Sequence, residues 1–493
     1  MSPEYEDRND VSRAFRFSAL NQVVTRIATF ISGIIVMRIL SPNDVGTVAG
    51  ATAFVVLCTS FNDICMGPAV IQYKGRIAQA ARNATTIALS GSVIIFCFFY
   101  FLAPYISTWL DNSKLTNVLR LLLLLVVIDG IGTVPLALLT RSLRQKAILF
   151  IETISLIIQI SVTVILAILD FGPYSIVWGM IASNAFSALA MFAIAHEASL
   201  PGYHFETSKK LLSFGITLAI SNLFRTATQY YDNIIVGITQ GTKTLGYYQL
   251  GYNGGNLPET TISATVSRVS FAWFSKIKEN ESYRKKAFHD LTLGLLATTL
   301  PFVTLLSVLA NDVVVTLYGE KWIPAANIVR ILAVLGGIRV FINFFAEIFS
   351  ANNKQVLELK LFSLWFISLV PSLLIGSLIG SITGVAFAHV LVAAFIILPF
   401  VLRKLHINDF SIFKTLKDSI TFWFGALLSG ISAYAVSRLI ESPFVTVLVA
   451  GAVGMSVYVL CCYKNLIAIK KSFSQPDHGF NESVVIKEGS ANV

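Results

Sequence analysis

Four polar side chains lie at helical spacing inside one long apolar stretch, where they could line a binding surface for a polar molecule. They are Asn222, Arg225, Gln229 and Asp232, separated by three, four and three positions. In a helix these positions share one face, which must contact protein or water rather than lipid. The face predicts either a hydrogen-bonding ladder between helices or a cavity wall. We favour the wall, because Arg225 and Asp232 lie two turns apart and are not ideal partners for each other.

Two further apolar stretches carry an arginine and amide side chains at similar spacing. The first contains Asn21, Gln22, Arg26, Thr29 and Gly33, and the second contains Arg339, Asn343 and Glu347. Arginine at the centre of a membrane helix costs about 2.5–3.5 kcal/mol even on lenient insertion scales. Its planar guanidinium suits diphosphate and carboxylate oxygens. We therefore expect Arg26, Arg225 and Arg339 to bind an anionic substrate, with the neighbouring amides bonding its polar groups.

Carboxylates within the apolar stretches have two candidate roles. They are Asp63, Asp129, Asp232 and Glu347. They could neutralise the arginines, or they could carry protons or sodium ions as coupling or gating groups. We favour pairing with arginine for Asp232 and Glu347. Asp63 follows Asn62 and precedes a Gly-Pro pair, so a place at a helix end or gate fits it as well as a binding role.

Residues 251–258, GYNGGNLP, combine three glycines and a proline inside an apolar stretch. Two structures fit this composition: close helix packing through small residues, and a bend that lines a cavity. We favour the bend, in which Asn253 and Asn256 would bond sugar hydroxyls. His389 stands alone in its own stretch, and we expect a buried structural role for it.

The composition of the whole chain is that of a polytopic membrane protein. Of its 493 residues 55% are hydrophobic and 13% are charged, against about 25% charged in soluble domains, and the mean hydropathy is +0.72. About fourteen apolar stretches are long enough to span a bilayer, where they must be helices. We expect them near 17–40, 44–72, 83–108, 116–139, 147–169, 173–196, 211–238, 245–273, 289–317, 325–350, 357–378, 381–402, 417–438 and 443–463.

Loop charges and an internal repeat predict how the spans are arranged. Lysine and arginine are concentrated in alternate loops, which places both termini in the cytoplasm and requires an even number of spans. Residues 34–36 match residues 234–236, and Gly46 then falls on Gly246. We therefore expect two parallel six-helix bundles around a central cavity, plus two extra helices. The expected divisions are a cytoplasmic segment 1–16, lobes 17–210 and 211–405, two helices in 406–465, and a cytoplasmic tail 466–493.

Several short segments, in their order and spacing, resemble those of Wzx-type polysaccharide flippases. That family lies in the polysaccharide-transporter branch of the multidrug/oligosaccharidyl-lipid/polysaccharide exporter superfamily. The similarity covers the first twelve expected spans and, more loosely, the last two. The segments that carry it are residues 37–46 (MRILSPNDVG), 62–67 (NDICMG) with Gln72, 232–237 (DNIIVG), 245–248 (LGYY) and 317–322 (LYGEKW).

This resemblance implies a function. Such a protein would move an undecaprenyl-diphosphate-linked oligosaccharide across the bacterial inner membrane by alternating access, for exopolysaccharide, capsule or O-antigen synthesis. It implies a cationic cavity, for which Arg26, Arg225 and Arg339 are the candidates. The expected partners are the lipid-linked substrate and membrane lipid, with a polymerase and export machinery as candidate protein partners. The chain is expected to act as a monomer.

Two other functions fit the composition less well. A cation-coupled drug or metabolite exporter of the same superfamily should favour carboxylates over arginines in its cavity. A membrane polymerase or glycosyltransferase needs a catalytic base and a sizeable outer loop, and the loops here are short. The sequence contains no phosphate-binding glycine loop and no histidines at metal-ligand spacing, so we expect no catalytic residue, cofactor, metal or nucleic-acid partner.

Overall fold

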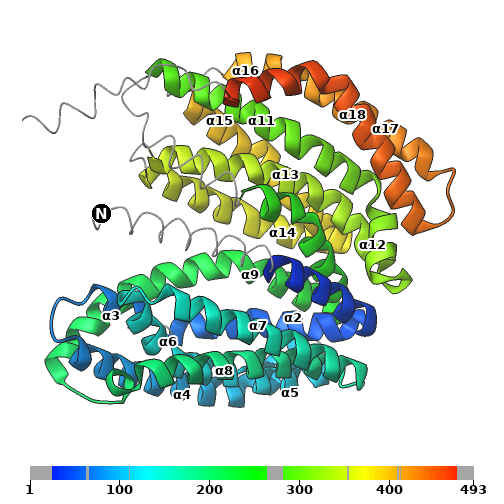
Figure 1. Cartoon of the computed structure of the whole chain (residues 1–493). Coiled ribbons are helices and arrows are strands. Elements are labelled where there is room, and N and C mark those ends of the chain that lie inside the picture. Colours follow the sequence, from blue (N-terminus) through cyan, green and yellow to red (C-terminus); the bar gives the residue numbers. More distant parts are fainter. Residues whose placement is uncertain are drawn as a thin grey trace, which may run out of the picture. The chain divides into compact units, whose positions relative to one another are not determined.

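The computed structural model is built from helices joined by short connections (Figure 1). It describes residues 25–62, 66–109, 112–263, 281–351, 355–407, 410 and 412–474. Within these ranges no residue is assigned to a β-strand. A helix satisfies all its backbone hydrogen bonds internally, as a segment surrounded by lipid must. The prediction of an all-helical fold is confirmed.

The chain divides into two compact units. Unit 1 comprises the chain up to Gly251 together with Leu317–Ile328 and Leu369–Ala388. Unit 2 comprises Tyr252–Thr316, Val329–Ser368 and the chain from His389 onward. The division into lobes 17–210 and 211–405 stays a prediction.

Unit 1 is a bundle of long helices whose core is formed by apolar side chains. Leu115, Leu119, Leu122 and Val126 are almost completely buried at its centre. Its elements are the helical residues 25–39, α2 (Pro42–Asn62), α3 (Met66–Gln72), α4 (Ile77–Trp109), α5 (Ser113–Leu122), α6 (Leu124–Arg141), α7 (Gln145–Ile168), α8 (Pro173–Ser199) and most of α9 (Phe205–Gly255).

Unit 2 has a second core, in which α17 and α18 pack against each other and against α11. Phe422, Tyr458 and Cys462 are buried there. Helices α12 to α14 contribute residues to both units. The elements are π-helix η1 (Glu259–Ser263), α11 (Glu281–Val308), α12 (Ala310–Tyr318), α13 (Ile323–Ala351), α14 (Gln355–Val392), π-helix η3 (Ala393–Ile397), α15 (Leu398–Ile407), α16 (Ile412–Asp418), α17 (Ile420–Ser437) and α18 (Pro443–Ser474). The 3₁₀-helix η2 (Glu320–Trp322), between α12 and α13, belongs to unit 1.

Nine helices in the described part of the chain are long and apolar enough to cross a membrane. One of them, Lys360–Leu405, is 46 residues long and is interrupted at Ser381, where φ is 56°. Helix α9 is interrupted in the same way at Gly241, where φ is 77°. Both breaks fall where the sequence predicts the end of one span and the start of the next. The chain is therefore a multi-pass membrane protein, and the count of fourteen spans stays a prediction.

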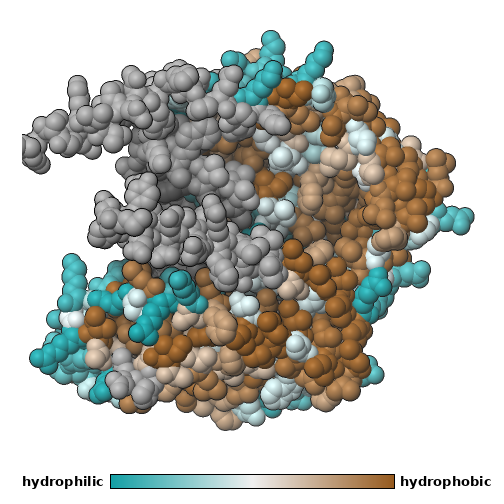
Figure 2. Space-filling model, in the orientation of Figure 1, coloured by the Kyte–Doolittle hydropathy of each residue, from teal (hydrophilic) through white to brown (hydrophobic). Residues whose placement is uncertain are grey.

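Large apolar side chains lie on the outside of both units. In unit 1, Phe101 on α4 is 73% exposed and Phe150 on α7 is 68% exposed. In unit 2, Phe395 is 74% exposed. Figure 2 shows hydrophobic residues over broad areas of the visible surface and hydrophilic residues gathered towards helix ends. Exposed apolar surface on this scale marks an interaction with membrane or protein, and in helices of this length and hydropathy the partner is lipid.

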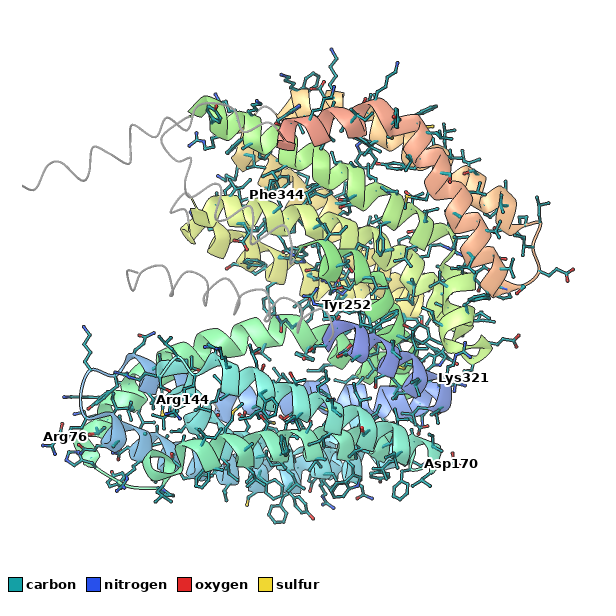
Figure 3. The ribbon with its side chains drawn as sticks, in the orientation of Figure 1. Arg76, Arg144, Asp170, Tyr252, Lys321 and Phe344 are labelled. Carbon is teal, nitrogen blue, oxygen red and sulfur yellow. The ribbon has the colours of Figure 1, made fainter. Side chains whose placement is uncertain are left out.

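The loops of unit 1 lie at two ends that differ in charge. In Figure 3, Arg76 and Arg144 lie at one end of the unit, and Asp170 and Lys321 lie at the other. The sequence places Arg76 and Arg144 in the lysine- and arginine-rich set of loops. Their position at a common end agrees with the predicted alternation of the spans. Which end faces the cytoplasm stays a prediction.

Candidate functional site

A guanidinium group in unit 2 is surrounded by polar groups from α13, from the last turn of α9 and from the segment that follows α9. Arg339 donates through Nη1 to Tyr252 Oη at 2.8 Å. The same nitrogen donates, at 3.4 Å each, to Asn256 Oδ1 and Glu259 Oε2. Asn343, one turn further along α13, donates through Nδ2 to Glu259 Oε1 at 3.0 Å. The structure thus brings the predicted residues Arg339, Asn256 and Asn343 together around a carboxylate.

Aromatic rings complete the surroundings of this arginine. The Cζ atom of Arg339 lies 5.5 Å from the ring centroid of Tyr252 and 5.8 Å from that of Trp365. Both distances are within the range of cation–π attraction. The Tyr252 ring lies 6.1 Å from the ring of His389, which is 2% exposed. Burial of His389 behind Tyr252 agrees with the structural role expected for it.

Close packing of glycines against α13 positions the polar groups around Arg339. A Cβ on Gly255 would lie 2.5 Å from Leu332 Cβ, and a Cβ on Gly336 would lie 2.6 Å from the carbonyl oxygen of Gly255. Side chains at either position would push the two segments apart. At Asn256 a turn interrupts the α-helix, and a π-helix starts at Glu259. Small-residue packing and a local departure from the α-helix are therefore both present.

The charges of the site compensate one another, and the site is partly accessible. The side chains of Arg339 and Glu259 are 15% and 22% exposed, and their closest charged atoms are 3.4 Å apart. A guanidinium presents its N–H donors in a planar fork that suits the oxygens of an anion. The cluster combines this group with amide groups that suit hydroxyls and with a carboxylate that competes with any anion for Arg339.

The other residues predicted around the seventh span are only partly described. The side chains of Asn222 and Arg225 lie outside the described residues, and so do Asn21, Gln22 and Asp63 entirely. Arg26 is exposed on the helix formed by residues 25–39, and Gln229 is exposed on α9. Asn253 is also exposed, and among the described contacts it does not join the cluster around Arg339. The roles predicted for these residues stay predictions.

The predicted carboxylate Asp232 is buried in unit 1. It is 4% exposed and accepts a hydrogen bond from Tyr248 Oη at 2.9 Å. The backbone N–H of Asn233 donates to its other oxygen at 2.8 Å. A buried carboxylate needs such donors, because desolvation of its charge is costly. Tyr248 is a partner that the spacing within a single helix did not indicate. Glu347 on α13 is half-buried.

A second polar region lies within unit 1. A cavity of about 380 Å³ is lined by Asp129 and Glu152, together with the hydroxyls of Thr133 and Thr140 and the amide of Asn184. Asp129 was predicted from its place inside an apolar stretch. Glu152 was not singled out, although it lies in the predicted span 147–169. Glu259 was missed in the same way. Both carboxylates would have been found if every acidic residue within a predicted span had been considered.

Two of the segments that carry the family resemblance pack directly against each other in unit 1. A Cβ on Gly46 would lie 1.7 Å from the carbonyl oxygen of Thr242, and a Cβ on Gly246 would lie 1.8 Å from that of Pro42. Gly46 and Gly246 are 200 positions apart, and so are Pro42 and Thr242. Each segment therefore makes the same contact with the other, as across a local two-fold axis. Thr242 Oγ1 also donates to Asn43 Oδ1 at 2.8 Å. This reciprocity supports the internal repeat.

A third resemblance segment, residues 317–322, closes the end of the helix formed by residues 25–39. Lys321 Nζ donates to the carbonyl oxygen of Arg38 at 2.7 Å. Trp322, fully buried, donates through Nε1 to the carbonyl oxygen of Met37 at 2.8 Å. In return Arg38 Nε donates to the carbonyl oxygen of Leu317 at 2.8 Å. Helix C-termini leave carbonyls without intrahelical partners and favour cations, which explains lysine and tryptophan in this segment.

Comparison with known proteins assigns the chain to a family. The family model described as "Polysaccharide biosynthesis protein" matches residues 35–327. An uncharacterized membrane protein in the cps region of Klebsiella pneumoniae is 22% identical, over 78% of this chain and 79% of the relative. The teichuronic acid biosynthesis protein TuaB of Bacillus subtilis (strain 168) is 24% identical, over 64% and 67%. The lipopolysaccharide biosynthesis protein WzxC of Escherichia coli (strain K12) is 21% identical, over 76% and 77%.

Solved structures show the same fold. The lipid II flippase MurJ in an inward closed conformation matches with a TM-score of 0.70 at 17% identity, over 90% of this chain and all of that one. An inward-facing multidrug resistance transporter of the MATE family matches with a TM-score of 0.55 at 14% identity, over 78% and 96%. At such identities the likeness establishes the architecture alone, and the family rests on the sequence match. The chain therefore belongs to the polysaccharide biosynthesis protein family.

Proposed function

We propose that this protein is a flippase that moves a lipid-linked oligosaccharide from the inner to the outer leaflet of a bacterial inner membrane. The observation that carries the proposal is the cluster around Arg339, in which two amides, a tyrosine hydroxyl and a carboxylate surround a guanidinium on the candidate membrane span Glu320–Phe349. Diphosphate oxygens suit the guanidinium, and sugar hydroxyls suit Asn256, Asn343 and Tyr252. Membership of a polysaccharide biosynthesis family supports a glycan substrate, with an undecaprenyl diphosphate carrier as the anion.

The pairing of Arg339 with Glu259 supports an exchange mechanism. Before substrate binds, Glu259 neutralises the arginine, so the site does not hold an unpaired charge in a region of low dielectric. A diphosphate then competes with Glu259 for the guanidinium. When the substrate leaves, Glu259 returns to Arg339. A site that alternates between an internal and an external anion binds its cargo without retaining it.

The contacts made by residues 37–46 support alternating access. These residues are held by 242–246 through reciprocal glycine packing and by 317–322 through hydrogen bonds to carbonyl oxygens. We propose that this arrangement is a closed gate on the non-cytoplasmic side. Opening would require the Gly46–Gly246 contact and the bonds from Lys321 and Trp322 to break. Hydrogen bonds with a small net free energy suit a contact that forms and breaks in each cycle.

The same proposal covers the remaining organisation of the chain. Both termini would lie in the cytoplasm, and the chain would act as a monomer made of a lobe 17–210, a lobe 211–405 and two further helices in 406–465. It would perform transport rather than catalysis, and it would supply its product to a polymerase and export machinery. Asp63, Asp129, Asp232 and Glu347 are candidates for coupling or gating.

Further substrate contacts are proposed on the first, seventh and eighth spans. Arg26 and Arg225 would contribute positive charge. Polar contacts would come from Asn21, Gln22, Asn222, Gln229 and Asn253.

Complementation of a deletion strain tests the proposal. The wild-type gene should restore polymer at the cell surface, whereas Arg339→Ala should fail to do so at normal membrane abundance. The matched control is Arg330→Ala, because Arg330 lies on the same helix, where it donates through Nε to the carbonyl oxygen of Ser307 at 3.1 Å. The control should restore export. Arg26→Ala and Arg225→Ala should abolish export as Arg339→Ala does.

The outcomes separate the proposed flippase from its main rival. Polymer output unchanged by the deletion would contradict the flippase. Increased sensitivity of the deletion strain to cationic drugs, with normal polymer, would favour a cation-coupled exporter.

A further inference from the structure

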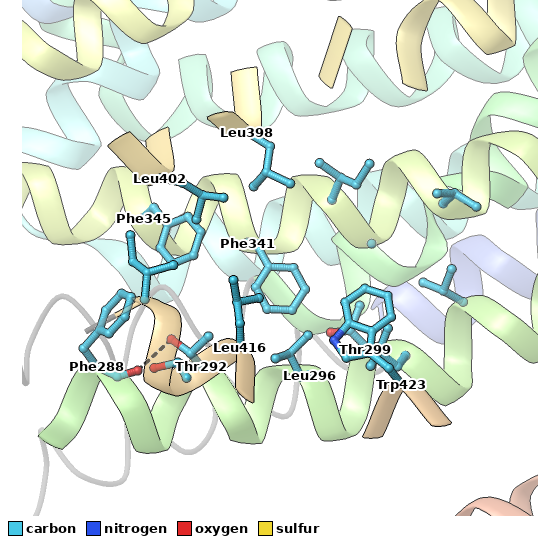
Figure 4. A pocket seen from close by; sticks show the side chains of 17 residues that line it. Phe288, Thr292, Leu296, Thr299, Phe341, Phe345, Leu398, Leu402, Leu416 and Trp423 are labelled. Carbon is cyan, nitrogen blue, oxygen red and sulfur yellow. Dashed lines mark hydrogen bonds between the residues drawn. The ribbon is translucent and has the colours of Figure 1, made fainter. Parts of the chain in front are cut away.

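An apolar groove lies within unit 2, apart from the cluster around Arg339. Its volume is about 210 Å³, and α11, α13, α15, α16 and α17 form its walls. Figure 4 shows Leu296, Phe341, Phe345, Leu402, Leu416 and Trp423 around it. The hydroxyl of Thr292, on the wall, donates to the carbonyl oxygen of Phe288 at 2.6 Å and is thereby satisfied. An apolar cavity of about 150 Å³ already accepts benzene, so this groove has room for a hydrocarbon ligand.

The groove is open and long enough for an acyl chain. Leu416 is 50% exposed and Trp423 is 52% exposed, so the wall formed by α16 and α17 opens to the surroundings. Along α11 the lining extends from Phe288 to Val303, which at 1.5 Å per residue is about 22 Å. One leaflet accounts for about 15 Å of a hydrocarbon core about 30 Å thick. The groove therefore matches a lipid chain in length better than it matches a compact ligand.

Positive charge lies at the end of the groove formed by α16. Lys414 and Lys417 are three positions apart on α16 and are both exposed, and Arg403 is exposed one residue beyond Leu402. The neighbouring carboxylate of Asp418 lies 3.3 Å from His289 Nε2, so another side chain already engages it. An apolar groove that ends in exposed lysines is complementary to a molecule with a hydrocarbon chain and an anionic head.

We propose that this groove binds an anionic phospholipid of the surrounding bilayer. One acyl chain lies along Phe341, Phe345 and Leu402, and the phosphate lies against Lys414 and Lys417. Basic residues on a short helix at the membrane surface attract anionic lipids, at about 1 kcal/mol per side chain. A zwitterionic lipid would fill the groove equally well and gain less from the lysines. The site is independent of the oligosaccharide substrate.

Lipid titration of the purified full-length protein tests the charge component. The protein is reconstituted in phosphatidylcholine nanodiscs that contain increasing fractions of phosphatidylglycerol. Trp423 fluorescence and thermal stability report binding of the anionic lipid. The wild type should prefer phosphatidylglycerol. Lys414→Gln/Lys417→Gln should reduce this preference about 30-fold, from two charges at about 1 kcal/mol each. The control Lys209→Gln/Lys210→Gln removes two exposed lysines from the start of α9 in unit 1 and should leave the preference unchanged.

Native mass spectrometry of the protein extracted from membranes identifies the occupant. The expected result is one retained phosphatidylglycerol or cardiolipin, lost in Leu416→Asn and kept in the control Leu427→Asn. Leu427 is 59% exposed on α17 and is not part of the groove lining. Equal affinity for phosphatidylcholine and phosphatidylglycerol would overturn the proposal. Retention of a polyprenyl lipid in place of a phospholipid, or an equal effect of the control and test variants, would also overturn it.

Discussion

Replacement of Glu259 by glutamine tests the exchange mechanism most sharply. The amide keeps the size of the carboxylate and one acceptor oxygen, so Asn343 or Arg339 retains a partner. It removes the negative charge that competes with substrate for Arg339. Glu259→Gln should therefore bind an anionic head group more tightly than the wild type and release it more slowly. Tighter binding together with slower transport is the expected signature, because cargo that is bound too well is not released.

The magnitude follows from the geometry of the ion pair. Two unit charges 3.4 Å apart attract each other by about 5 kcal/mol at an effective dielectric constant of about 20. Desolvation of two partly buried groups offsets most of this attraction. A net contribution of about 1–2 kcal/mol remains, which corresponds to roughly a 5- to 30-fold gain in affinity for undecaprenyl diphosphate. Glu259→Ala is a poorer test, because it leaves Asn343 without its acceptor and opens a cavity.

Tryptophan fluorescence provides the assay, since Trp365 lies 5.8 Å from Arg339 Cζ. Undecaprenyl diphosphate is titrated into wild type and Glu259→Gln, and Trp365→Phe in each background assigns the signal. Undecaprenol, which lacks the diphosphate, is the control ligand and should bind both proteins equally. Unchanged or weaker diphosphate binding by a folded Glu259→Gln protein would refute the competition between Glu259 and substrate.

Three further substitutions test the structure around the proposed gate and the buried carboxylate. Gly46→Ala should destabilise the protein by about 1–3 kcal/mol through overpacking, because its Cβ would lie 1.7 Å from the Thr242 carbonyl oxygen. The control in thermal unfolding is Gly33→Ala, whose Cβ would have nothing within 4 Å, and equal stability of the two variants would contradict the close contact at Gly46. Tyr248→Phe removes a hydrogen bond of 2.9 Å to buried Asp232 and should cost about 1.5–3 kcal/mol, with Tyr463→Phe, exposed on α18, expected to have no effect in the same denaturation measurement. Trp322→Phe loses the hydrogen bond to the Met37 carbonyl oxygen and should raise the rate at which a cysteine placed at position 40 reacts with a thiol reagent. An equal rate for that cysteine in the protein that keeps Trp322 would argue against Trp322 as part of the closed gate.

Helices and their breaks were predictable from the sequence because lipid imposes one secondary structure and a fixed length. The predicted ends near 238 and 378 coincide with Gly241 and Ser381, where positive φ interrupts longer helices. The repeat spacing of 200 was also visible, and it brings Gly46 and Gly246 into contact. These features depend on local composition and on periodicity, which a single sequence contains.

The site was predictable only in part, because its partners come from distant segments. Helical spacing placed Arg339 and Asn343 on one face of a span, and the Gly-rich segment indicated Asn256. Glu259 was missed, since its contact with Arg339 joins residues 80 positions apart in the sequence. Pairing across such distances depends on helix packing, here the close approach of Gly255 to α13, which periodicity within one helix does not report.

Transfer of a lipid-linked oligosaccharide between leaflets of proteoliposomes tests the central claim most directly. Purified protein is reconstituted with a fluorescent undecaprenyl-diphosphate-linked oligosaccharide, and a membrane-impermeant quencher counts the molecules that reach the outer leaflet. The account predicts transfer by the wild type and by Arg330→Ala, and loss of transfer in Arg339→Ala. Absence of transfer by folded, reconstituted wild-type protein would contradict the account. Equal transfer by the wild type and by Arg339→Ala would also contradict it.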